Sequence, residues 1–156
     1  MTLIQISWDS YQNLAKKIIE QLEQENYRPD MIVGIARGGL PPMVTISSYY
    51  KIRQVGVVFM QKTATDKEFS SMLPEAICHG YGIPFDVADK NVLVIDNIVQ
   101  SGQTLRGALK LVQELGAKSV KTVSICKHKE TYEFSHFAPM EVESDDWVVF
   151  PWDQLT

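Results

Sequence analysis

The sequence has few cysteines and no long hydrophobic run. Its two cysteines, Cys78 and Cys126, are too few for a disulfide framework. No apolar stretch approaches the roughly 20 residues that a membrane-spanning helix needs. The amino terminus also lacks the basic segment and apolar core of a signal peptide. We therefore expect free thiols, no membrane association and a cytoplasmic location.

An excess of basic charge is also absent. The chain has 15 lysines and arginines against 19 acidic residues, a formal net charge of -4 at pH 7. Nucleic acid is therefore an unlikely partner, because binding it requires a basic face. Neither a Walker phosphate loop nor a Gly-x-Gly-x-x-Gly motif occurs, which disfavours P-loop kinases and dinucleotide-binding enzymes.

The length and composition are those of one globular domain. The chain has 156 residues, 45% of them hydrophobic and 22% charged, and we expect a single domain over residues 1–156. Short apolar runs alternate with amphipathic segments, which predicts a Rossmann-like α/β fold: an open, mostly parallel sheet flanked by helices. The predicted strands are 31–36, 55–60, 92–95, 120–126 and 147–150, and the predicted helices are 8–26, 41–50 and 105–115.

Residues 61–90 do not follow this pattern. They contain Pro74, Pro84, Gly80 and Gly82 and have no regular apolar spacing. A loop of about thirty residues is unusual in a compact domain and is more often a functional lid or a locally folded excursion. We therefore interpret residues 61–90 as a lid over a site at the carboxyl ends of the strands, where such sheets bind ligands.

The most informative stretch is the strand, turn and helix that begin at Asn91. A buried strand ends in Asp96 and Asn97, a small turn follows, and an amphipathic helix begins near Leu105. The first turn of a helix presents free N–H groups, and its macrodipole favours negative charge. Gly102 allows a tight turn. This stretch therefore predicts an anion-binding site.

The stretch resembles the phosphoribosyl-pyrophosphate (PRPP) signature of type I phosphoribosyltransferases. The resemblance implies the fold of that family, with a small C-terminal hood over residues 127–156, and it points to the bacterial xanthine-guanine and hypoxanthine members. It implies that Asp96 and Asn97 hold the ribose hydroxyls. The 5-phosphate of PRPP would bind at Gln100, Ser101, Gly102, Gln103 and Thr104.

Two positions depart from the family pattern. Asn97 stands where the signature has a second acidic residue, and an amide carries no charge to stabilise a cationic transition state. Gln100 stands where the 6-oxopurine members have an aspartate that handles a purine proton, and glutamine cannot accept that proton. The resemblance still gives the catalytic set as Asp96, Asn97, Gln100 and Arg37.

The segment Arg37–Gly39, which follows the first predicted buried strand, predicts a second anion site. Paired glycines, Gly38 and Gly39, expose successive backbone N–H groups, and Arg37 adds a cation. The segment resembles the pyrophosphate loop of the family, in which the peptide bond before the basic residue can be cis. We therefore expect pyrophosphate to bind at Arg37, Gly38 and Gly39 and the Ala36–Arg37 bond to be cis.

The C-terminal segment, from Asp146 to Asp153, resembles the base-binding hood of bacterial xanthine-guanine phosphoribosyltransferases. The resemblance implies that Trp147 stacks on a purine, that the Val148 backbone contacts the base edge, and that Asp153 lies near magnesium. A lysine, either Lys127 or Lys129, would bond the base. Alternatively, the tryptophans of this segment only anchor the fold.

The resemblance implies transfer of a nucleobase to PRPP, in purine salvage, with Mg²⁺ as cofactor and Asp96 and Asp153 near the metal. The base would be a 6-oxopurine: guanine, xanthine or hypoxanthine. The products would be a nucleoside monophosphate and pyrophosphate, and the family leads us to expect a homodimer or homotetramer. Two alternatives stay open: a regulatory protein that binds PRPP or a nucleotide with little turnover, and a phosphoribosyltransferase for another base.

Overall fold

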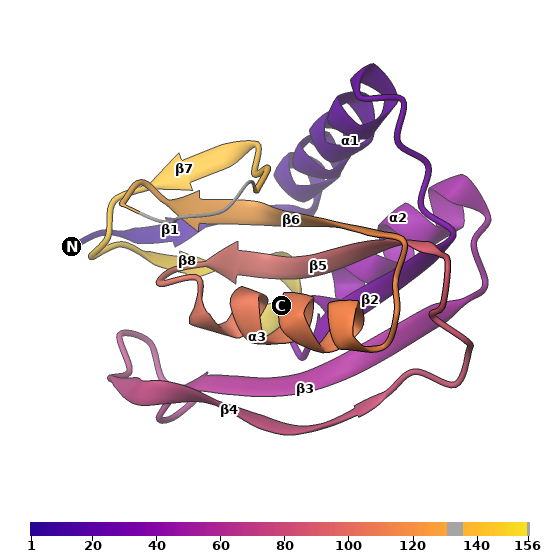
Figure 1. The fold of residues 1–156 in the computed structure, drawn as a ribbon. Helices are drawn as coiled ribbons and strands as arrows, with labels where there is room; N and C mark the ends of the chain where they lie inside the picture. Colours follow the sequence, from indigo (N-terminus) through magenta and orange to yellow (C-terminus); the bar gives the residue numbers. More distant parts are fainter. Residues whose placement is uncertain (131–135, 156) are drawn as a thin grey trace.

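The computed structural model describes residues 1–130 and 136–155 and is built around one twisted sheet (Figure 1). In these residues the sheet has the strand order β4-β3-β2-β5-β6-β7, and every neighbouring pair is parallel except β3 and β4. This confirms the predicted open, mostly parallel sheet. The strands are β2 (Met31–Ala36), β3 (Val55–Thr63), β4 (Met72–Gly82), β5 (Asn91–Val99), β6 (Ser119–His128) and β7 (Met140–Val142).

Helices cover both faces of the sheet. Helices α1 (Trp8–Gln24) and α2 (Leu40–Tyr50) pack on one face, and α3 (Gln103–Glu114) packs on the other. Helix α1 begins where the Ser7 hydroxyl accepts the N–H of Ser10 at 3.1 Å, an N-cap that satisfies one free donor. In the part of the chain that is described, no helix is long and apolar enough to span a membrane.

A small second sheet brings the two ends of the chain together. Strand β1 (Leu3–Gln5) pairs in parallel with β8 (Trp147–Val149), and a single 3-10 turn, η1 (Pro151–Asp153), follows. Strands β1 and β7 were not predicted, because three residues are too few to show a period. Of the predicted hood, residues 131–135 and 156 lie outside the described residues.

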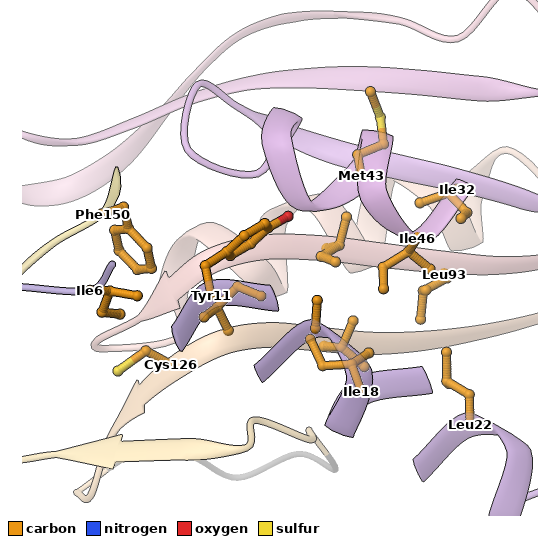
Figure 2. Close-up of a cluster of buried hydrophobic side chains, with 14 of the residues drawn as sticks. Ile6, Tyr11, Ile18, Leu22, Ile32, Met43, Ile46, Leu93, Cys126 and Phe150 are labelled. Atoms are coloured by element: carbon orange, nitrogen blue, oxygen red, sulfur yellow. The ribbon is translucent and has the colours of Figure 1, made fainter. Parts of the chain in front are cut away.

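The two apolar layers meet at the central strands. Figure 2 shows Ile18 and Leu22 of α1 and Ile46 of α2 packed beside Ile32 and Leu93 of the sheet. The opposite face of the same strands packs on the buried side of α3, which consists of Leu105, Ala108 and Val112. Strand β5 is therefore buried on both faces, which explains its continuous apolar run.

Residues 61–90 are more regular than the sequence predicts. Strand β3 extends to Thr63, and β4 returns antiparallel to it, so these two strands form a hairpin at the edge of the sheet. The predicted strand therefore ended three residues too early, and the segment that follows it is locally folded, one of the two alternatives that the sequence left open. Strand β4 is exposed along most of its length and contains Pro74 and Gly80, so it has no buried face to impose an alternating pattern.

Candidate active site

A cleft of about 1130 Å³ lies at the carboxyl ends of β2 and β5, between the β3–β4 hairpin and the C-terminal segment. Most of the residues that the sequence singles out line it: Arg37, Gly38, Asp96, Asn97, Gln100, Ser101, Gly102, Thr104, Trp147, Val148 and Asp153. A smaller cavity of about 400 Å³ beside the C-terminal ends of α1 and α2 contains none of them. The large cleft is therefore the candidate site.

Asp96 lies at the floor of this cleft, near the end of β5. Its side chain is only 8% exposed, and one carboxylate oxygen, Oδ1, accepts the backbone N–H of Asn97 at 2.8 Å. Burial disfavours the ionised form and raises the pKa of Asp96 to about 7, an effect that the hydrogen bond from Asn97 only partly opposes. Near neutral pH this carboxyl group can therefore both donate and accept hydrogen bonds.

The loop after β2 packs directly against the end of β5. A methyl group on Gly38 would lie 2.3 Å from Cγ of Asn97, and one on Gly39 would lie 2.5 Å from the Ile95 carbonyl oxygen. At Gly39 the close atoms are backbone, so only glycine fits, whereas a side chain at Gly38 would have to displace the Asn97 amide. The Ala36–Arg37 peptide bond is cis, as predicted. The predicted pyrophosphate loop and the predicted ribose-binding pair are therefore in contact.

Arg37 extends from this loop toward the tip of the hairpin. Its side chain is 79% exposed, and its guanidinium donates to Oδ1 of Asp66 at 2.6 Å. Asp66 could not be found from the sequence, because it lies in a segment without periodicity and reaches Arg37 only through the fold. The cation predicted to hold pyrophosphate is thus paired with a carboxylate of the same chain.

The predicted phosphate loop has the geometry of an anion site. Gly102 caps α3 in the left-handed conformation, with φ of 82°, which other residues seldom adopt. Ser101, Gly102 and Thr104 line the cleft, and the Ser101 hydroxyl accepts the N–H of Gln103 at 3.4 Å. Gln103 is not among the residues that line the cleft. The N-terminus of α3 therefore faces the cleft through the loop and Thr104.

The C-terminal segment forms the opposite wall of the cleft. Trp147 lies against Phe69 of the hairpin, with ring centroids 5.7 Å apart and planes inclined by 44°. Phe69 was not predicted, for the same reason as Asp66. Trp152 stacks on Phe150 at 5.0 Å and meets Tyr11 edge-on, so it packs against the core as the anchoring alternative expects, and it also lines the cleft.

Comparison with known proteins agrees with this architecture. The profile of the phosphoribosyl transferase domain matches residues 7–154, nearly the whole chain. The chain belongs to the phosphoribosyltransferase family.

Solved structures with this family's fold resemble the protein along its full length. A purine phosphoribosyltransferase from Pyrococcus horikoshii Ot3 is 25% identical, with a TM-score of 0.78 over 100% of this chain and 97% of its own. A Neisseria gonorrhoeae protein with bound ppGpp is 21% identical, with a TM-score of 0.82 over 99% and 90% of the two chains. The Helicobacter pylori xanthine-guanine-hypoxanthine phosphoribosyltransferase is also 21% identical, with a TM-score of 0.71 over 97% and 93%.

The two lysines that the resemblance offers as alternative base contacts are both paired with carboxylates. Lys127 forms an ion pair with Glu141 at 3.2 Å, and Lys129 pairs with Glu143. Neither lysine is among the residues that line the cleft. Base contact by Lys127 or Lys129 stays a prediction, and it requires a ligand or a conformation that draws one of them from its carboxylate.

The cleft suits a magnesium ion that arrives with a phosphorylated ligand. No group of three or more His, Cys, Asp or Glu residues within 1–130 and 136–155 could hold a metal. Asp96 and Asp153 both line the cleft, and Oδ2 of Asp153 accepts the N–H of Phe150 at 2.9 Å. Magnesium often binds through one or two carboxylates plus substrate phosphates, and these residues fit that pattern.

The raised pKa of Asp96 predicts a pH dependence of stability. In the unfolded chain an aspartate loses its proton near pH 4, whereas the folded protein keeps it to about pH 7. Between these values the folded state binds more protons, so its free energy of unfolding falls as pH rises. Relative to Asp96→Asn, the wild type should lose on the order of 4 kcal/mol across this window and nothing further above about pH 8.

Urea denaturation of the wild type and Asp96→Asn from pH 4 to pH 8.5 measures this difference, and other titrating groups cancel in the comparison. A difference between the two proteins that stays constant with pH would show that Asp96 is ionised throughout.

The Arg37–Asp66 ion pair predicts that the hairpin competes with an anionic ligand. Asp66→Asn should strengthen pyrophosphate binding by up to roughly fivefold, because an exposed ion pair contributes about 0.2–1 kcal/mol. Calorimetric titration at low salt measures the affinity. Glu68→Gln is the matched control, since Glu68 lies in the same hairpin and lines the same cleft. Equal strengthening in both variants would indicate a general charge effect instead of competition for Arg37.

Proposed function

We propose that the protein is a PRPP-dependent phosphoribosyltransferase that joins a 6-oxopurine to PRPP and releases pyrophosphate. The observation that carries the proposal is the convergence in one cleft of Asp96, the α3 phosphate loop and Trp147. Asp96 suits the ribose, the loop suits the 5-phosphate, and Trp147 suits the base. The similarity to a purine phosphoribosyltransferase at 25% identity supports the same assignment.

The cleft would act mainly by holding the reactants in line. The N–H groups at the start of α3 and the Ser101 and Thr104 hydroxyls would bind the 5-phosphate. Asp96 and Asn97 would bind the ribose hydroxyls, and Arg37 with the Gly38 backbone would bind the pyrophosphate. With both phosphate groups fixed, the anomeric carbon is held toward a base stacked on Trp147, which lowers the entropic part of the barrier.

Magnesium, when bound with PRPP, neutralises charge on the leaving pyrophosphate. Asp96 and Asp153 are the residues that would hold it or its water ligands. Phe69 and Asp66 of the hairpin contact Trp147 and Arg37, two residues that line the cleft, and closure of this lid would exclude water that could otherwise intercept an oxocarbenium-like state.

The decisive experiment is product formation with PRPP, magnesium and each of guanine, xanthine, hypoxanthine, adenine, uracil and orotate. We expect a nucleoside monophosphate and pyrophosphate with at least one 6-oxopurine, and near-complete loss of turnover in Asp96→Ala. Turnover of only adenine or a pyrimidine would reassign the base. No turnover of any base would contradict the proposed activity.

Gln100 predicts slow chemistry with 6-oxopurines. Glutamine cannot accept the purine proton, and a positioned general base typically contributes 10²–10⁴-fold to a rate, so Gln100→Asp should raise kcat by roughly 100-fold. Gln113→Asp is the matched control, because it makes the same substitution at an exposed position of α3 that does not line the cleft. Steady-state kinetics with the best base provides the measurement. Equal kcat values for the wild type and Gln100→Asp would show that proton removal does not limit the rate.

A second candidate function is nucleotide sensing by the same cleft. Asn97 and Gln100 remove two carboxylates from the signature, and a protein with the same fold was crystallised with bound ppGpp. A sensor would bind GMP or ppGpp tightly in calorimetry while forming no product with any base. Turnover at a rate typical of enzymes, of order 1 s⁻¹ or more, would exclude a purely regulatory role.

A further inference from the structure

Two cations border the cleft in the part of the chain that the structure describes. One is Arg37, which the sequence assigns to the pyrophosphate. The other is Lys62, near the end of β3, which no feature of the sequence singles out. PRPP carries two separate anionic groups, a pyrophosphate and a 5-phosphate. A cleft that binds both benefits from a cation at each.

The side chain of Lys62 extends from β3 to the start of α3. Its ammonium donates to the side-chain oxygen of Gln103, the first residue of that helix, at 2.9 Å. It also donates to the carbonyl oxygens of Leu73 at 2.5 Å and Pro74 at 3.1 Å, both on β4. These three acceptors are neutral oxygens, whereas Arg37 meets the carboxylate of Asp66.

We propose that Lys62 is a phosphate-binding residue that contacts the 5-phosphate of PRPP or of the nucleotide product. This inference rests on the proposed function, which places that phosphate at the N-terminus of α3. An ammonium forms stronger hydrogen bonds to an anion than to a neutral carbonyl, so a phosphate at the loop would displace one of its present acceptors. Lys62 also joins the hairpin to α3 and would therefore couple the lid to an occupied phosphate site.

The proposal predicts different effects of the Lys62 substitution on the binding of two simple ligands. Ribose 5-phosphate contains only the phosphate assigned to Lys62, and inorganic pyrophosphate contains only the group assigned to Arg37. Lys62→Met, which keeps most of the aliphatic chain, should weaken ribose 5-phosphate binding about tenfold and change pyrophosphate binding by less than about twofold. Arg37→Met should show the reverse preference.

Isothermal titration calorimetry with each ligand measures both affinities without requiring turnover. Lys67→Met is the matched control, because it removes the same charge from an exposed position at the hairpin tip. Lys62→Arg should retain most of the affinity for ribose 5-phosphate. Thermal denaturation of each variant reports folding, and Lys62→Gln gives the same comparison if Lys62→Met does not fold.

Equal affinity of the wild type and the Lys62 variants for ribose 5-phosphate would overturn the inference alone, because a wild type that binds the ligand still supports the proposed function. Equal weakening by Lys62→Met and Lys67→Met would also overturn it, since that result describes a long-range charge effect. A wild type that binds neither ligand would overturn the proposed function and this inference together.

Discussion

The burial of β5 on both faces is the constraint on which the site depends. This strand lies between β2 and β6, and its residues alternate between the layer of α1 and α2 and the layer of α3. A strand held in this way ends at a fixed point, so the carboxyl group of Asp96 stays at the floor of the cleft with little solvent around it. The same packing that positions Asp96 also raises its pKa, and its position and its chemistry therefore have one cause.

Close backbone approach connects the second anion site to the first. Because Gly38 and Gly39 have no side chains, the loop after β2 lies directly on Asn97 and on the carbonyl oxygen of Ile95. Any movement of this loop therefore acts on the residues predicted to hold the ribose. The cleft has a floor formed by the ends of two buried strands and a more exposed hairpin beside it, and the ion pair between Arg37 and Asp66 links the two parts.

The sequence predicts those features of the fold and the site that a few neighbouring residues encode. The continuous apolar run of β5 and the turn at Gly102 can each be recognised from a few neighbouring residues. The resemblance to the family adds Arg37 and Trp147 to the predicted site. The hairpin gives no such signal, because an exposed edge strand has no buried face to impose a period. Asp66 and Lys62 reach the cleft, and Phe69 reaches Trp147, only through tertiary structure. The lysine pairs with Glu141 and Glu143 depend on where the chain passes alongside β6, and the three-residue β7 is too short to predict.

The charge of the cleft floor relates the two candidate functions to each other. Asn97 and Gln100 are neutral, and Asp96 is only partly ionised near pH 7, so the floor repels a polyanionic ligand less than a pair of ionised carboxylates would. The same loss of negative charge lowers the stabilisation of a cationic transition state. Interactions that favour the bound ground state without favouring the transition state tighten binding and do not raise kcat. We therefore expect a cleft of this composition to combine tight binding of phosphorylated ligands with slow transfer, and the measured rate decides whether it serves as an enzyme or as a sensor.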